Sequence, residues 1–196
     1  LLLKGKNNMI NVIQKKQEIG IVKRQDISEN QAKIVYLALG SNLGSRITNI
    51  EKSKLLLISN NIKIIKCSNY YETYSWPNKN FPKYLNIIIK IKTKLNLNNL
   101  FILIKSIEKK LGRKKIPINY PRTCDIDIID YNKKCISIDI GKHKLNVPHP
   151  RMKNRNFVLI PLFEISRNWI HPKSNENISK LISKINFSDL RSIKVA

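Results

Sequence analysis

Apolar residues in this chain recur with two spacings, every second position and every third or fourth position, which predict strands and helices respectively. The alternation is clearest over residues 84–95, where every odd-numbered residue is apolar or threonine, and we expect a strand there. Short apolar runs predict further strands over residues 34–39 and 125–131. Residues 62–74 alternate loosely and are rich in β-forming side chains, so we expect strand structure there as well.

Helical spacing predicts helices over residues 45–59, 97–111 and 156–165, and Gly112 is a natural stop for the second of them. A last amphipathic segment covers residues 177–186. This order of strands and helices predicts an α+β fold, with helices packed on the faces of a sheet that contains antiparallel pairs.

The sequence predicts two regions of different character. Residues 1–32 are polar and charged without a sustained period, so we expect a poorly ordered tail, followed by one domain over residues 33–196. Hydrophobic residues make up 42% of the chain, too many for a wholly disordered protein. No apolar run approaches the roughly 18 residues of a membrane span, and the leucines at positions 1–3 are too few for a secretory signal.

Cysteine and histidine are too sparse and too irregularly spaced to predict a structural zinc site. The chain has three of each, and the odd number of cysteines argues against a disulfide framework. We therefore expect reduced thiols and a cytoplasmic location.

The formal net charge of +24 raises the hypothesis of a nucleic-acid-binding protein, because a basic surface attracts polyanions. The excess is mostly lysine and accompanies abundant isoleucine and asparagine, a mixture that AT-rich coding would produce without selection for a partner. In either case the lysines should raise the local concentration of an anionic substrate such as ATP.

Asp125 and Asp127 are the first candidates for chemistry. Residues two apart in a strand face the same way, so both carboxylates should project together while Ile126 and Ile128 enter the core. Two such carboxylates suit magnesium, which completes its shell with water and substrate phosphates. The alternative is an amphipathic edge strand with an acidic outer face. With 13 acidic residues against 37 basic ones, an acidic pair beside Arg122 favours the metal.

Basic residues flank this pair, with Arg113-Lys114-Lys115 upstream and Arg122 just before it. Cations near a metal-bound polyphosphate neutralise the charge that develops during phosphoryl transfer. The lysines could equally belong to a solvated loop, whereas Pro121 fixes the approach of Arg122 and favours a functional role for it.

A third group of residues is suited to a flat ligand, because rings stack on it and an amide reads its edge. Lone aromatic residues in strands more often belong to the core, and it is their combination that favours a ligand. The group comprises Thr73, Tyr74, Trp76, Tyr84, Asn86 and Phe157. His149 could contact a phosphate, shuttle a proton or cap a turn, and the residues alone leave this open.

Four segments occur in a characteristic order, and they are residues 38–44 (ALGSNLG), 84–86 (YLN), 121–127 (PRTCDID) and 147–152 (VPHPRM). In order and spacing they resemble the 6-hydroxymethyl-7,8-dihydropterin pyrophosphokinase family of folate synthesis. The resemblance covers about residues 33–172, and the PRTCDID segment is its most specific part.

The resemblance implies a ferredoxin-like α+β fold and transfer of the β,γ-diphosphate of ATP to the pterin hydroxymethyl oxygen, with release of AMP. It implies two Mg²⁺ ions on Asp125 and Asp127, and a phosphate clamp made by the catalytic residues Arg113 and Arg122. The implied ATP-binding residues are Glu108, Lys115, His149 and Arg155. In the implied pterin site, Tyr84 and Phe157 sandwich the ring, and its edge is lined by Thr73, Tyr74, Trp76 and Asn86.

The chain departs from the family pattern in the loop before Arg122, which is a residue shorter and reads Asn119-Tyr120 where many members have Arg-Trp-Gly. Lys115 replaces a common second arginine, and Lys105 replaces a glutamine seen in some members. Two alternatives remain, a basic nucleic-acid-binding protein on the same fold and another metal-dependent phosphoryl transferase. With ATP and the pterin as partners, we expect a monomer with no nucleic-acid or membrane partner.

Overall fold

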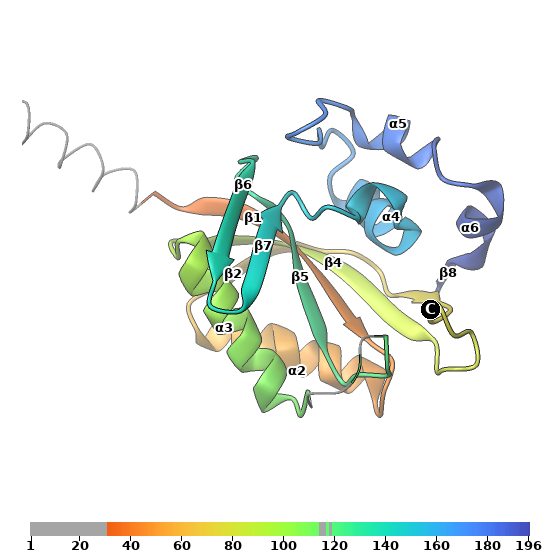
Figure 1. Cartoon of the computed structure of the whole chain (residues 1–196), viewed down its shortest axis with the longest axis horizontal. Coiled ribbons are helices and arrows are strands. Elements are labelled where there is room, and N and C mark those ends of the chain that lie inside the picture. The colour runs from red at the N-terminus through yellow and green to blue at the C-terminus, as the bar shows by residue number, and fades with distance from the viewer. Residues whose placement is uncertain (1–30, 114–116, 118) are drawn as a thin grey trace, which may run out of the picture. The chain divides into compact units, whose positions relative to one another are not determined.

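The structure is a computed structural model that describes residues 31–113, 117 and 119–196 (Figure 1). Residues 1–30 of the predicted tail and Lys115 lie outside the described residues, and the described elements form one unit over Lys33–Ala196. In chain order the elements are β1 (Lys33–Ser41), α2 (Arg46–Ser59), β2 (Lys63–Cys67), β3 (Tyr71–Thr73), β4 (Tyr84–Thr93), α3 (Leu97–Lys110), β5 (Asp125–Tyr131), β6 (Ile136–Ile140), β7 (His143–Val147), η1 (Met152–Asn154), α4 (Asn156–Ile165), α5 (Ile178–Ile182), α6 (Phe187–Ser192) and β8 (Lys194–Val195).

The main sheet of the described unit has the strand order β5-β1-β4-β3-β8, and β2 also pairs with β4. Every pairing in it is antiparallel. Strand β1 thus lies between β4 and β5 in the sheet. Helix α2 follows β1 along the chain, and helix α3 follows β4. This connectivity is the ferredoxin-like α+β fold, which confirms the predicted fold class.

Helices cover both faces of the sheet, with α2 and α3 on one side and α4, α5 and α6 on the other (Figure 1). Strand β4 shows the consequence most clearly. Ile87 and Ile89 enter the core shared with α2 and α3, while Ile88 enters a second core with α4 and α5, and all three are fully buried. The prediction of a strand was right, but this strand is central and buried on both faces.

Helix α3 begins and ends as its sequence suggests, whereas α2 lacks a side-chain cap at its start. Asn96 caps α3 by accepting a hydrogen bond from the backbone of Asn99, and Gly112, with φ of +81°, terminates it. Ser45 occupies the N-cap position of α2, but its hydroxyl contacts Thr48 Oγ1 at 2.7 Å and makes no capping bond.

Two predicted segments differ from the structure. The strand expected over residues 62–74 is split into β2 and β3, because Ser68 interrupts the ladder and its hydroxyl accepts the hydrogen bond from Ile88 N at 3.0 Å. The segment expected over residues 177–186 is shorter, since α5 ends at Ile182.

Five described elements were not predicted, the two strands of the β6–β7 hairpin, the short helix η1, the helix α6 and the strand β8. Strand β6 does alternate, with half-buried Ile136, Ile138 and Ile140 between exposed polar residues, so the sequence carried a signal there that was missed, whereas β7 has no such alternation. No helix among the described residues is long and apolar enough to cross a membrane.

Candidate active site

The candidate site lies where three adjacent strands bring an amide, a glycine and a carboxylate into one row. Gly40 of β1 is paired with Asn86 of β4 on one side and with Asp125 of β5 on the other. Directly opposed residues of antiparallel strands project to the same face of the sheet. Gly40 has no side chain, so it leaves room between Asn86 and Asp125. A Cβ there would lie 3.3 Å from Asn86 Oδ1 and 3.5 Å from Tyr84 Cδ1.

The two predicted metal carboxylates do project together from β5. Asp125 and Asp127 are partly exposed, at 27% and 32%, while Ile126 and Ile128 are buried between and beyond them. Asp127 lies opposite Ala38, the next small residue on this face of β1. The alternation read from the sequence is therefore present in the structure.

Cationic side chains surround both carboxylates. Asp125 Oδ1 lies 2.6 Å from Arg113 Nη1, and Asp125 Oδ2 lies 3.3 Å from Arg122 Nη1. Asp127 Oδ2 lies 3.2 Å from Arg155 Nη1 and 3.8 Å from His149 Nε2. The structure thus brings together the predicted metal pair, both predicted clamp arginines and two predicted ATP residues.

The residues present fit a magnesium site of the predicted kind. Carboxylate oxygens are the hard ligands that Mg²⁺ prefers, and it commonly takes one or two of them together with water and phosphate oxygens. In the described part of the chain, no cluster of three or more His, Cys, Asp or Glu residues could hold a metal ion. The remaining ligands would therefore come from substrate and solvent.

Glu108 lies behind the carboxylates and is 2% exposed. Its carboxylate accepts hydrogen bonds from Ile126 N at 2.8 Å, from Lys105 Nζ at 2.8 Å and from Arg113 Nη1. Burial raises the pKa of Glu108, and the neighbouring Lys105 and Arg113 act in the opposite direction. Glu108 therefore ties helix α3 to the start of β5 in this structure, and its contact with ATP stays a prediction.

His149 lies beside Asp127, and its surroundings favour the neutral imidazole by lowering its pKa. Burial lowers its pKa, as do Arg155 and Arg151, while Asp127 opposes them. Its Nδ1 accepts a hydrogen bond from Arg151 N at 3.2 Å, so the proton of the neutral ring is on Nε2, the atom that faces Asp127.

The predicted pterin residues separate into a buried group and an exposed group. Asn86 and Thr73 are buried, and Asn86 Nδ2 donates to Thr73 Oγ1 at 3.0 Å and to Tyr71 O at 3.4 Å. Tyr74 and Trp76 are 52% and 74% exposed, so their rings do not line a closed pocket in this structure.

The two rings predicted to sandwich the pterin lie near different residues of the site, Tyr84 near Gly40 and Phe157 near Arg155. Tyr84 lies beside Gly40, and burial raises the pKa of its hydroxyl. Phe157, at the start of α4, has the Arg155 guanidinium 5.4 Å from its ring centroid.

Two polar groups beside the row received no role from the sequence. Thr123 Oγ1 is buried without a hydrogen-bond partner among the described residues. Asn42 is 1% exposed and bonds to both Arg122 and the loop between β3 and β4. Both belong to segments that carried the family resemblance, but a lone Thr or Asn gives no signal of such contacts.

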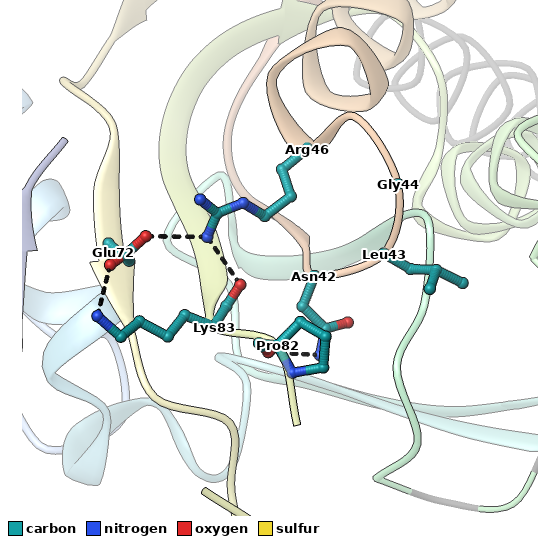
Figure 2. A pocket seen from close by; sticks show the side chains of 7 residues that line it. All are labelled: Asn42, Leu43, Gly44, Arg46, Glu72, Pro82 and Lys83. Carbon is teal, nitrogen blue, oxygen red and sulfur yellow. Dashed lines mark hydrogen bonds and ion pairs between the residues drawn. The ribbon is translucent and has the colours of Figure 1, made fainter. Parts of the chain in front are cut away.

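A cavity of about 460 Å³ lies beside the site (Figure 2). Its lining includes Glu72, which alternates with Tyr71 and Thr73 on β3 and so faces the other side of the sheet. None of the predicted site residues lines this cavity. Its lining residues are Asn42, Leu43, Gly44, Arg46, Glu72, Pro82 and Lys83.

Comparison with known proteins identifies the family. Residues 36–167 match the 7,8-dihydro-6-hydroxymethylpterin-pyrophosphokinase family. The chain is 41% identical over 138 residues to the 2-amino-4-hydroxy-6-hydroxymethyldihydropteridine pyrophosphokinase of Aquifex aeolicus, a match that covers 70% of this chain and 83% of that protein. The corresponding Bacillus subtilis enzyme is also 41% identical, over 133 residues, with 67% of this chain and 77% of that protein covered.

Some relatives are much longer. The chain is 36% identical over 172 residues to the folic acid synthesis protein of Pneumocystis carinii, a match that covers 88% of this chain but 22% of that protein. A crystal structure of Plasmodium falciparum HPPK-DHPS with pteroate matches with a TM-score of 0.64 at 18% identity, over 79% of this chain and 42% of that one, and supports the fold.

These matches confirm the resemblance read from the four segments and do not favour the nucleic-acid-binding alternative. The chain belongs to the 7,8-dihydro-6-hydroxymethylpterin-pyrophosphokinase family, the ATP-dependent pyrophosphokinases of folate synthesis.

Proposed function

We propose that this chain transfers the β,γ-diphosphate of ATP to 6-hydroxymethyl-7,8-dihydropterin. The hydroxymethyl oxygen attacks the β-phosphorus and loses its proton, and the bond from that phosphorus to the oxygen shared with the α-phosphate breaks. The products are AMP and the pterin diphosphate. The observation that carries the proposal is the row Asn86–Gly40–Asp125, which places an amide suited to a pterin edge beside carboxylates suited to Mg²⁺–ATP.

Asp125 and Asp127 would hold two Mg²⁺ ions, which would neutralise charge on the ATP phosphates. The arginines have one role before the metal ions bind and another after they bind. In this structure Arg113 and Arg122 pair with Asp125. Once the carboxylates hold cations of their own, these guanidinium groups can turn their donors to phosphate oxygens, for which their planar fork is suited.

Asn86 would read the pterin edge. Its Nδ2 is engaged by Thr73 and Tyr71, and its Oδ1 points toward Gly40, where no described group donates to it. That oxygen can therefore accept a hydrogen bond from an amino or ring N–H group of the ligand. Tyr84 and Phe157 would stack on the two faces of the ring. Tyr74 and Trp76 would contribute backbone groups, since their rings are largely exposed.

His149 and Arg155, next to Asp127, would contact ATP, and Glu108 would support this end of the site by holding Arg113 and the backbone of Ile126. A covalent intermediate is not needed, because positioning and charge neutralisation can supply the rate in phosphoryl transfer. We expect the chain to act as a monomer in the cytoplasm without a nucleic-acid partner.

The test is product analysis with purified protein, ATP, Mg²⁺ and the pterin alcohol. We expect AMP and pterin diphosphate in equal amounts, formed only when the pterin and Mg²⁺ are both present. Formation of ADP would indicate a simple phosphoryl transferase instead, and ATP turnover that does not depend on the pterin would contradict the proposal.

A further inference from the structure

The end of strand β1 is joined to two other segments by one buried side chain, that of Asn42. Toward the phosphate end of the site, Asn42 Oδ1 accepts from Arg122 N at 2.8 Å, and Asn42 N donates to Arg122 O at 3.2 Å. Asn42 therefore holds both backbone groups of the arginine whose side chain pairs with Asp125.

Toward the pterin end, Asn42 Nδ2 donates to Ser75 Oγ at 3.1 Å and to Pro82 O at 3.1 Å, and Figure 2 shows the second of these bonds. Ser75 Oγ itself donates to Pro82 O at 2.6 Å. Ser75 and Pro82 lie near the two ends of the loop between Thr73 and Tyr84, so these bonds fasten both ends of that loop together.

Asparagine is suited to this place because it offers one carbonyl acceptor and two N–H donors on a short side chain. The side chains of Asn42 and Ser75 are 1% and 3% exposed, so the bond between them is buried, and the bonds to Pro82 O and from Arg122 N are partly buried. Buried polar networks of this kind are rigid when every member is paired, and removing one member leaves the others unsatisfied.

We propose that Asn42 is a positioning residue that fixes the spacing between Arg122 at the phosphate end and the loop over residues 74–83 at the pterin end. The inference rests on the proposed function. In transfer between two bound substrates, the reacting atoms must be held about 3 Å apart and aligned, and a misplacement of about 1 Å can lower the rate by about 100-fold. Asn42 touches neither reacting group and acts through the two segments that it joins.

The experiment compares two substitutions of Asn42 with a matched control. Asn42→Ala removes both sets of side-chain bonds. Asn42→Asp keeps the acceptor for Arg122 N but places a carboxylate oxygen against Pro82 O. The control is Asn49→Ala, because Asn49 Nδ2 supports the same turn through Ser41 Oγ at 3.2 Å and Leu43 O at 2.9 Å, without a bond to either substrate-side segment.

At a temperature below its melting temperature, Asn42→Ala should have a kcat roughly 10- to 100-fold lower than the wild type, since both substrates are misaligned. For Asn42→Asp we expect the KM of the pterin to rise more than the KM of ATP, because the bonds to the pterin-side loop are lost while the Arg122 bond remains. For Asn49→Ala we expect a lower melting temperature with kcat within about 2-fold of the wild type. Pterin affinity measured by fluorescence should fall in the two Asn42 variants and stay near the wild-type value in Asn49→Ala.

Equal kinetic losses in Asn42→Ala and Asn49→Ala, or an unchanged kcat in folded Asn42→Ala, would overturn the inference. If Asn42→Ala does not fold, Ser75→Ala is a milder variant that removes the two bonds of the Ser75 hydroxyl and keeps the bond from Asn42 to Pro82 O. An unchanged pterin KM in both Ser75→Ala and Asn42→Asp would overturn the inference as well. These outcomes are separate from failure of the proposed function, which would appear as a wild-type protein without pterin-dependent AMP formation.

Discussion

At the scale of single residues, the site consists of two carboxylates whose charge is already compensated before any metal binds. Arg113 and Arg122 pair with Asp125, and Arg155 pairs with Asp127. From the sequence alone, two aspartates two positions apart would be expected to repel each other. In the structure the ion pairs offset that repulsion, because removal of Asp125 would leave Arg113 and Arg122 close together, and removal of Asp127 would leave Arg155 without its carboxylate partner.

Asp125→Asn and Asp127→Asn should each lower turnover by about 100-fold or more, since a metal contact contributes several kcal/mol to stabilisation of the transition state. The free energy of unfolding should fall by no more than about 1 kcal/mol, because the ion pairs are partly exposed. The measurements are steady-state turnover and the melting temperature with and without Mg²⁺ and a non-hydrolysable ATP analogue. The rise in melting temperature caused by these ligands should shrink in both variants.

Asp139→Asn serves as the control, since Asp139 is an exposed aspartate of the β6–β7 hairpin. It should leave turnover and the ligand-induced shift unchanged. Full activity in both Asp125→Asn and Asp127→Asn would mean that the pair is an acidic strand face without a metal.

At the scale of elements, the loop before β5 meets the loop before β4 through two aromatic rings. Phe81 and Tyr120 have ring centroids 5.4 Å apart, with an interplanar angle of 47°. Tyr120 stands at the position where the loop departs from the family pattern, and it is 49% exposed. The contact links the segment that leads to Arg122 with the segment that leads to Tyr84.

Tyr120→Ala should weaken substrate binding by about 1 kcal/mol, the magnitude of one aromatic contact. We expect the effect on the pterin KM in particular, because Phe81 belongs to the loop between Thr73 and Tyr84. The control is Phe187→Ala, which removes another exposed ring, stacked on Arg191 in α6, and should leave both KM values unchanged. Unchanged affinity for ATP and the pterin in Tyr120→Ala would show that the ring lies away from both substrates.

At the scale of the whole molecule, the dominant property is the net charge of +24. Such a charge attracts anions over distances comparable to the Debye length, about 10 Å at 0.1 M salt, and salt screens it. ATP is a polyanion and the pterin alcohol carries no net charge, so the two substrates should respond differently.

Raising the ionic strength from about 0.05 M to about 0.5 M should increase the KM of ATP several-fold and leave the KM of the pterin nearly unchanged. The pterin serves as the internal control in the same titration. Equal responses of the two constants would mean that salt acts on the stability or the catalytic step rather than on the attraction of ATP.

Much of the architecture could be predicted because it depends on local periodicity. The bounds predicted for β5 and α4 match the structure, and the alternation in β5 correctly placed Asp125 and Asp127 on one face. Residues two apart in a strand share a face whatever the rest of the chain does. The four segments also identified the family, since their residue types and spacing are specific.

The tertiary structure decided what depends on contacts between distant segments. No local pattern reveals that Gly40 lies between Asn86 and Asp125, that Glu108 binds the backbone of Ile126, or that Asn42 joins Arg122 to Pro82. The hydrogen bonds among these contacts span 18 to 80 positions along the chain. They exist because strand register and buried hydrogen bonding are settled only when the sheet and its loops close on one another. The partners of a buried polar residue are then fixed by the cost of leaving its donors and acceptors unpaired.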